Sequence, residues 1–252
     1  MDKNIFLLWL QGWDNIEYLQ KQVAESWEIN NPEWKIHYLD LNNIKDYIDD
    51  IDYLFDKNKE ISMQAASDII RLSLLKKYGG VWADATLLCM QPLDYWIFEA
   101  IEPGGIWMYH GNRIYNDLQC PESWFIISKK EDYIISKWKL ECDNYWNKNN
   151  LTSNYFWMDE LFKKLFFNDE IFKKLWLKVP YLNCELDGQS HTFATHKMED
   201  NTEHIKKLFE DKPPYALKFS KYFNDISHDI NNNGNKAIEL SKRKMIYKHL
   251  FN

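Results

Sequence analysis

The amino-acid sequence predicts an α/β fold, in which helices flank a sheet that binds ligands at the carboxyl ends of its strands. Three observations carry this prediction. Residues 5–10 form an unbroken apolar run, as in a strand buried on both faces. Residues 34–39 alternate between apolar and polar side chains, as a second strand does. A helical segment at 63–78 ends at two glycines and leads into a short apolar strand at 81–83.

The helices of the first ninety residues follow from their capping residues. Asp14 is placed to cap a helix that runs to about Ile29, and a further helix is expected at residues 46–55. Ser62 caps the strong helix that ends at Tyr78. The resulting order, strand, helix, strand, helix, helix, strand, is typical of an α/β sheet.

Short apolar runs and amphipathic segments predict the elements of the second half. Strands are expected at 106–109, 124–127 and 216–219, and helices at 131–146, 155–167, 170–175 and around His204. A polar loop at 231–235 precedes a C-terminal helix at about 236–252. Because no linker or repeat interrupts the chain, we predict a single domain over residues 1–252 with a helical C-terminal part.

Composition narrows the class of partner. A net charge of -7 argues against nucleic acid, which demands a basic surface. Aromatic residues make up 16% of the chain, which favours a ring-shaped ligand. The four cysteines, at 89, 120, 142 and 184, form no Cys-x-x-Cys pair, so we expect reduced thiols and a cytoplasmic protein. The apolar run at the N-terminus is too short to span a membrane.

The helix at 63–78 carries Gln64, Asp68 and Arg71 on one face. One interpretation is an exposed ion pair, worth a few tenths of a kcal/mol. The other is a carboxylate that binds ribose or sugar hydroxyls and is steadied by the arginine. The spacing alone favours neither interpretation.

Asp84 ends the short strand after Val81 and Trp82. A carboxylate at a buried strand terminus needs a partner, because an unpaired charge there is costly. Mg²⁺ or Mn²⁺ is one such partner and also bridges diphosphate oxygens. An N-cap or a loop salt bridge is the alternative.

Several segments together resemble a known family. Ser67-Asp68, Arg71, Tyr78-Gly79-Gly80 and Trp82-x-Asp84 are similar to the sugar-binding region of the DxD glycosyltransferases. The resemblance is strongest to the capsular polysaccharide synthesis proteins and the Och1-type mannosyltransferases, and the clostridial glucosylating toxins carry a similar core. Further segments agree in order: Trp9-Leu10-Gln11-Gly12, Ser26-Trp27, Asn31-Pro32-x-Trp34, Trp124-Phe125-Ile126, Tyr155-Phe156-Trp157-Met158-Asp159 and Leu217-Lys218-Phe219-Ser220-Lys221.

The resemblance implies a GT-A fold that binds a nucleotide sugar, uses Mn²⁺ or Mg²⁺ and retains the anomeric configuration. By position, Asp68 and Arg71 contact the donor sugar or ribose, and Asp84 is the first acid of the DxD motif. The turn that follows the first strand lies beside the base. The donor-binding residues expected on this basis are Trp9, Gln11, Gly12, Asp68, Arg71, Gly80, Trp82, Lys218 and Lys221.

The sequence departs from the family pattern at Thr86, which stands where the second acid of DxD is expected. The expected metal ligands are therefore Asp84, Thr86 and Ser220, with His191 and His196 as further candidates for completing the shell. Alternatively, Lys218 or Lys221 neutralises the diphosphate as a point charge. We assign catalytic roles to Asp84 and to Asp159, which follows an aromatic cluster and is placed to orient the acceptor hydroxyl.

The function expected from the resemblance is that of a bacterial retaining glycosyltransferase in capsule or surface polysaccharide synthesis. It would move galactose or glucose from a UDP-sugar to a polysaccharide or lipid-linked oligosaccharide. A toxin-like transferase that modifies a host protein and a catalytically silent carbohydrate-binding protein are the alternatives. The basic residues after Lys236 indicate either a peripheral contact with an anionic membrane or a packing helix with a solvated face.

Overall fold

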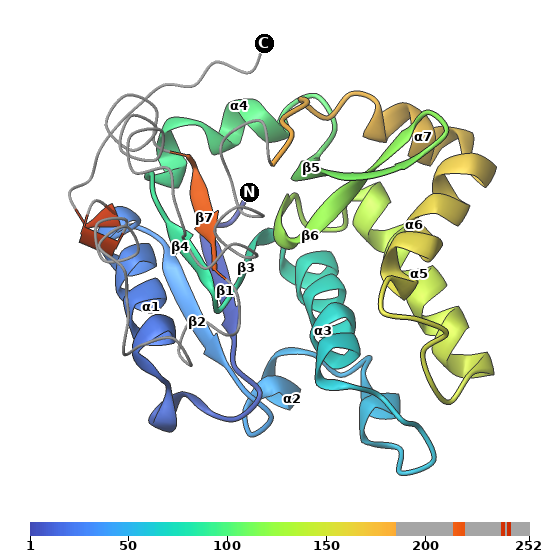
Figure 1. Cartoon of the computed structure of the whole chain (residues 1–252), viewed down its shortest axis with the longest axis horizontal. Coiled ribbons are helices and arrows are strands. Elements are labelled where there is room, and N and C mark those ends of the chain that lie inside the picture. The colour runs from blue at the N-terminus through green and yellow to red at the C-terminus, as the bar shows by residue number, and fades with distance from the viewer. Residues whose placement is uncertain (185–213, 220–237, 240, 243–252) are drawn as a thin grey trace.

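A five-stranded mixed sheet forms the centre of the molecule (Figure 1). The computed structural model describes residues 1–184, 214–219, 238–239 and 241–242. The strand order is β2-β1-β3-β6-β5, and β4 pairs with β7 in a separate two-stranded sheet. The strands are β1 Asn4–Leu8, β2 Lys35–Leu39, β3 Gly80–Asp84, β4 Leu87–Cys89, β5 Ile106–Tyr115, β6 Leu118–Ser128 and β7 Ala216–Lys218.

Helices flank this sheet, so the predicted α/β class is confirmed. In Figure 1, α1 lies beside β2, and α3 and α5 to α7 stack at the other end of the molecule. Helix α3 packs against α5, and α5 packs against α6 and α7. The α-helices are α1 Tyr18–Asn30, α2 Ile44–Tyr47, α3 Met63–Tyr78, α4 Ile97–Ile101, α5 Tyr133–Lys148, α6 Trp157–Asn168 and α7 Glu170–Trp176. Short 3-10 turns cover Trp13–Asn15, Asp52–Phe55 and Leu93–Tyr95.

Two of the predicted helices are wrong in detail. Asp14 lies in a 3-10 turn and caps nothing, because Ile16 is extended and α1 begins only after Glu17. The helix expected at 46–55 is split into two short turns, since Ile48 between them is also extended. By contrast, the helix that begins after Ser62 is confirmed, and the Ser62 hydroxyl accepts a hydrogen bond from the backbone N–H of Ala65.

Strands β5 and β6 are longer than the sequence predicts because they form an antiparallel hairpin. Its turn contains Asn116 with a φ of 53°, a left-handed conformation that asparagine tolerates. Strand β6 also pairs antiparallel with β3, and Ala83 lies opposite Phe125. This pairing brings Ser123 and Glu122 to the carboxyl end of β3.

The register of β1 on β3 sets the position of the turn after β1. Leu8 lies opposite Asp84, so Trp9 and the residues after it follow at the same edge of the sheet. At the other end of β3, Gly80 has a φ of 100°, and a Cβ there would lie 2.6 Å from the Asn4 carbonyl oxygen. Gly80 is therefore required for the close approach of β3 to β1.

Many of the aromatic residues are buried in the core, where they are not accessible to a ligand. Trp27, Trp82, Trp107 and Trp138 are each at most 1% exposed. The rings of Trp96 and Tyr215 stack with centroids 4.0 Å apart, which fastens β7 to the rest of the molecule. All four cysteines are buried, and no disulfide joins them, in agreement with the reduced thiols expected from the sequence.

The C-terminal basic segment is described only at residues 238–239 and 241–242. There, the Lys242 ammonium lies 2.8 Å from Glu25 and hydrogen-bonds Gln22 on α1. Asn30 of α1 donates to the Ser241 carbonyl oxygen. These contacts favour the packing interpretation for this stretch. None of the helices in the described parts of the chain has both the length and the apolar character to cross a membrane.

Candidate functional site

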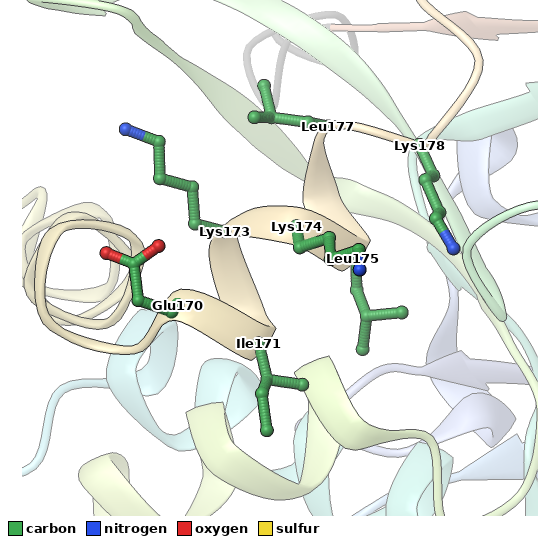
Figure 2. Close-up of a pocket in the computed structure, with 7 residues that line it drawn as sticks. All are labelled: Glu170, Ile171, Lys173, Lys174, Leu175, Leu177 and Lys178. Carbon is green, nitrogen blue, oxygen red and sulfur yellow. The ribbon is translucent and has the colours of Figure 1, made fainter.

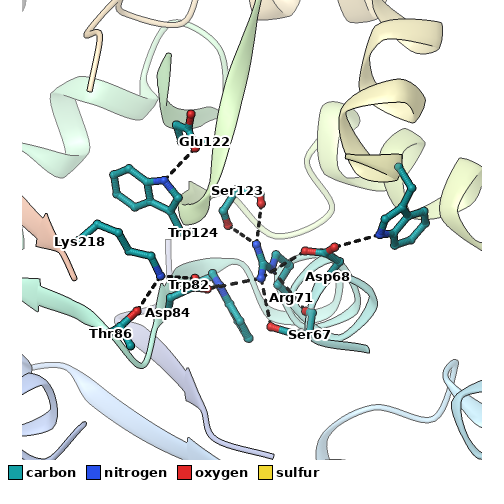
Figure 3. A network of polar contacts seen from close by, with 11 residues as sticks. Ser67, Asp68, Arg71, Trp82, Asp84, Thr86, Glu122, Ser123, Trp124 and Lys218 are labelled. Atoms are coloured by element: carbon teal, nitrogen blue, oxygen red, sulfur yellow. Dashed lines mark hydrogen bonds and ion pairs between the residues drawn. The ribbon is translucent and has the colours of Figure 1, made fainter. Parts of the chain in front are cut away.

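Acidic and basic side chains from three elements meet at the carboxyl end of β3 (Figure 3). Helix α3 contributes Asp68 and Arg71, β3 contributes Asp84, and β7 contributes Lys218. We call these four residues the charged cluster. Ligands of α/β sheets bind at the carboxyl ends of strands, so the cluster lies where the fold predicts a site.

Arg71 lies at the centre of the charged cluster and is fully engaged. One of its terminal nitrogens donates to both the carbonyl and the hydroxyl oxygen of Ser123, each at 2.7 Å. The other terminal nitrogen lies 3.3 Å from Asp68 and 3.4 Å from Asp84 and also donates to the Ser67 hydroxyl. Its side chain is only 6% exposed, so Arg71 is a buried cation that neutralises two carboxylates rather than part of an exposed pair.

Asp84 accepts hydrogen bonds on both carboxylate oxygens, yet its side chain remains partly exposed to solvent. The Trp82 indole donates to its Oδ1 at 3.0 Å, and the Lys218 ammonium donates to its Oδ2 at 2.6 Å. Burial alone would raise the pKa of Asp84, but Lys218 and Arg71 outweigh it and hold the pKa below its ordinary value. The side chain is still 24% exposed, so this charged carboxylate can meet a ligand.

In contrast to Asp84, Asp68 has a raised pKa, because the effect of burial outweighs that of the nearby cation. Burial raises its pKa to about 6 despite the attraction of Arg71, and the negative charges of Asp84 and Asp159 raise it further. Its second oxygen accepts a hydrogen bond from the Trp157 indole at 3.1 Å, which connects α3 to the start of α6.

Replacing Asp68 with asparagine should stabilise the protein at neutral pH but not in acid. Because the folded-state pKa lies above the unfolded value, the wild-type free energy of unfolding falls as pH rises between these two values. Asp68→Asn cannot ionise, so relative to wild type it should gain about 2 kcal/mol between pH 4 and pH 7.5. Urea denaturation at both pH values measures the gain. If the free energies of unfolding of Asp68→Asn and wild type differ by the same amount at both pH values, the raised pKa of Asp68 is contradicted.

A second group of charges lies beside the charged cluster. Asp159, in the first turn of α6, accepts a hydrogen bond from the Arg113 guanidinium at 2.5 Å. Arg113 also lies 3.6 Å from Glu122, and its guanidinium carbon lies 4.8 Å from the centre of the Phe156 ring. Burial raises the pKa of Asp159 in spite of Arg113. The Asp159 carboxylate is thus better suited to accept a proton than an exposed aspartate.

The other predicted site residues fall into three groups. Trp9, Gln11 and Gly12 lie at the same edge of the sheet as Asp84, and the Gln11 amide contacts the Met63 sulfur on α3. The Trp82 side chain is buried, at 1% exposure, and its indole donates to Asp84. Gly80 lies at the opposite end of β3 from Asp84, so it is not part of the charged cluster. Ser220, Lys221, His191 and His196 lie outside the described residues.

Sequence reasoning missed four contributors to the site. Ser123 and Glu122 enter through the antiparallel pairing of β6 with β3, which no local pattern announces. Arg113 comes from β5 and contacts Asp159 of α6, and Trp157 comes from α6 and contacts Asp68 of α3. For Trp157, the aromatic cluster before Asp159 was an available signal.

The described residues fit a divalent metal ion poorly. Mn²⁺ and Mg²⁺ take several oxygen ligands, usually including more than one carboxylate or several phosphate oxygens. The only oxygens that the predicted ligand set offers here are those of Asp84 and Thr86, and both residues accept hydrogen bonds from the Lys218 ammonium. Among the residues described, no three His, Cys, Asp or Glu side chains are grouped to hold a metal.

A surface pocket along α7 is separate from the charged cluster (Figure 2). It is lined by polar and apolar side chains of α7 and of the two residues after it: Glu170, Ile171, Lys173, Lys174, Leu175, Leu177 and Lys178. Lys173 pairs with Asp117 at 2.8 Å. The pocket shares no residue with the site at Asp84.

A mixed sheet flanked by helices, with a cluster of acids and bases at its strand ends, places the chain in the α/β class. The chain belongs to the capsular polysaccharide synthesis protein family, whose model matches residues 1–234.

Two fungal glycosyltransferases are similar to part of the chain. The O-glycosyltransferase braB of Annulohypoxylon truncatum is 30% identical over 95 residues, which are 33% of this chain and 23% of that protein. The glycosyltransferase afumC of Aspergillus fumigatus is 31% identical over 112 residues, 40% of this chain and 28% of that protein. The chain therefore matches only about a quarter of the length of either relative.

Solved glycosyltransferase structures resemble the chain at lower identity. The PaToxG glycosyltransferase has a TM-score of 0.44 and 16% identity, covering 96% of this chain and 86% of that one. The apo form of GlyE from Streptococcus pneumoniae has a TM-score of 0.45 and 10% identity, covering 95% and 62%.

Proposed function

We propose that this protein is a retaining glycosyltransferase of the GT-A type that acts in capsule or surface polysaccharide synthesis. It moves a hexose, galactose or glucose, from a UDP-sugar to a polysaccharide or lipid-linked oligosaccharide. Its family and the glycosyltransferases it matches in part support the reaction class. The observation that carries the proposal is the charged cluster, which offers hydroxyl-binding carboxylates and fixed cations together at the strand ends.

The cluster suits both halves of a nucleotide-sugar donor. Asp68 and Asp84 present carboxylate oxygens that accept hydrogen bonds from sugar or ribose hydroxyls. Lys218, 18% exposed, presents a cation to the diphosphate. The turn at Trp9, Gln11 and Gly12 lies at the same edge and receives the base.

The transfer that best suits these residues is front-face displacement. The anomeric C–O bond to the diphosphate breaks, and its electron pair leaves with the phosphate oxygen. The acceptor hydroxyl oxygen forms the new bond on the same face, and its proton passes to the departing phosphate. Because the acceptor attacks the face from which the phosphate departs, this route preserves the anomeric configuration without a protein nucleophile, and the departing phosphate serves as the base.

Asp159 and its neighbours suit the acceptor. Tyr155 is 76% exposed and Phe156 is 44% exposed, just before the helix that carries Asp159. Exposed aromatic faces stack on the apolar faces of sugars. The acceptor sugar therefore packs on Tyr155 and Phe156 while Asp159, held by Arg113, accepts a hydrogen bond from its hydroxyl. A lipid-linked acceptor would place the protein at the cytoplasmic face of the membrane.

The test is an incubation with a panel of nucleotide sugars. The wild-type protein should release free nucleotide slowly by hydrolysing one donor, with UDP-galactose and UDP-glucose as the first choices. Asp84→Ala should abolish the release. If no donor is hydrolysed and no nucleotide binds, the protein is not a transferase, and the carbohydrate-binding alternative takes its place.

Asp159→Asn separates the acceptor side from the donor side. It should leave donor hydrolysis within about threefold of wild type, because Asp159 does not contact the donor in our proposal. Transfer to an alkyl galactoside or glucoside should fall by about 10–100-fold, since the acceptor hydroxyl loses the carboxylate that orients it. Product formation measured by mass spectrometry reports transfer. Equal losses in hydrolysis and transfer would place Asp159 on the donor side instead.

A further inference from the structure

The Lys218 ammonium occupies the position that the family resemblance implies for a metal ion. Its Nζ lies 2.6 Å from Asp84 Oδ2 and 2.7 Å from the Thr86 hydroxyl (Figure 3). These two residues are the first acid of the motif and the threonine that stands where the second acid is expected. A monovalent ammonium thus bridges the two ends of the motif.

The backbone holds this ammonium in place. Strand β7 pairs antiparallel with β4, so Lys218 lies opposite Leu87. The backbone N–H of Phe219 donates to the Thr86 carbonyl oxygen at 2.9 Å. Lys218 on β7 and Thr86, directly before β4, are therefore fixed side by side, and the cation needs little rearrangement to meet an anionic ligand.

A divalent cation at the same point would have to displace these contacts. Asp84 already accepts hydrogen bonds from Trp82 and Arg71 on one oxygen and from Lys218 on the other. An incoming ion would also lie close to the positive charges of Arg71 and Lys218, which repel it.

We propose that Lys218 is the fixed cation of the donor site and does there what a divalent metal ion would do, so that donor binding does not require a metal. An ammonium carries three protons. Two donate to Asp84 and Thr86, and the third donates to a diphosphate oxygen of the donor. This inference rests on the proposed function, because it assumes a nucleotide-sugar ligand.

Charge balance explains why threonine replaces the second acid. Asp68 and Asp84 carry two negative charges, and Arg71 and Lys218 carry two positive ones. A second aspartate at position 86 would make the site net negative and repel a diphosphate. The Thr86 hydroxyl accepts a hydrogen bond from the ammonium at 2.7 Å and adds no charge.

Calorimetric titration with UDP tests the proposal. Wild type should bind UDP in EDTA and in Mn²⁺ with affinities within about twofold of each other. Lys218→Met should weaken UDP binding by about 10–100-fold, the worth of one charge-assisted hydrogen bond, and Mn²⁺ should not restore it. Lys173→Met is the matched control, because Lys173 also pairs with an aspartate, Asp117, but lies outside the site. It should bind UDP as wild type does.

A second variant puts an acid back at position 86 and removes the lysine that takes the place of the metal ion. The double change Thr86→Asp with Lys218→Met restores a second acid and removes the ammonium, so it should bind Mn²⁺ when followed by electron paramagnetic resonance of the ion. Wild type should leave the free Mn²⁺ signal unchanged. This readout needs neither donor nor turnover.

Two results would overturn the inference. If wild type binds UDP only with Mn²⁺, or if the free Mn²⁺ signal falls with wild type, a metal ion rather than Lys218 is the cation, and the proposed function stands. If wild type binds neither UDP nor any other nucleoside diphosphate in either condition, the proposed function fails and this inference with it.

Discussion

Arg71→Met should lower the free energy of unfolding by about 3–5 kcal/mol, because it leaves two buried carboxylates without their shared cation. The side chain is 6% exposed, so solvent does little to screen the loss. Its partners include both oxygens of Ser123 and the carboxylates of Asp68 and Asp84. Urea denaturation followed by circular dichroism measures the change.

The pH dependence of this loss distinguishes charge from packing. Without Arg71, the pKa values of Asp68 and Asp84 should both rise, because the cation that lowers them is gone. Protonation then relieves the unpaired charges, so the destabilisation should be clearly smaller at pH 4 than at pH 7.5.

Two further variants serve as controls for the stability of Arg71→Met. Lys164→Met removes an exposed partner of Glu141 and should cost less than about 1 kcal/mol. Arg71→Lys keeps the charge but lacks the planar fork, so it should recover only part of the lost stability. A loss for Arg71→Met no larger than that for Lys164→Met would show that the charged cluster is not stabilised by Arg71.

The part of the site that the sequence predicts is the part made by local geometry. Asp68 and Arg71 are three residues apart on one helix, and their pairing follows from helical spacing. Asp84 follows from a short strand that begins at a glycine turn and ends at this carboxylate, and α3 and β3 lie where the sequence predicts them. One alternative is settled: the pair is buried and shared rather than exposed.

The missing part depends on contacts between distant segments. Ser123 reaches Arg71 because β6 runs antiparallel to β3, whereas local patterns predict a strand without its direction. Lys218 reaches Asp84 across 134 residues, through the pairing of β7 with β4. Strand β4 was not predicted, since three apolar residues give too short a pattern. The alternative of Lys218 as a point charge was available from the sequence, but its contact with Thr86 was not.

Asp84→Asn should lower nucleotide release from the donor by at least about 100-fold, the largest effect on activity that we expect from an isosteric change. The lowered pKa keeps Asp84 ionised at neutral pH, and that charge holds both Arg71 and Lys218. Asparagine has the same shape, yet its amide cannot accept charge-assisted hydrogen bonds on both sides. Among the described residues, Lys218 then keeps only its hydrogen bond to Thr86, and Arg71 loses one of its two carboxylate partners, so the sugar and the diphosphate meet a less preorganised site.

A matched variant separates this effect from a general loss of structure. Asp117→Asn removes the charge of an aspartate that also pairs with a lysine, at 2.8 Å on the surface. It should retain nucleotide release within about twofold of wild type, because exposed pairs contribute little. Asp84→Asn should lose some stability at neutral pH, since a lowered folded-state pKa means that the charged form stabilises the native state. That loss should shrink as pH falls through the folded-state pKa, whereas the activity defect should persist at any temperature where the variant is folded. Release by folded Asp84→Asn close to the wild-type rate would remove Asp84 from catalysis and leave it as a structural partner of Arg71.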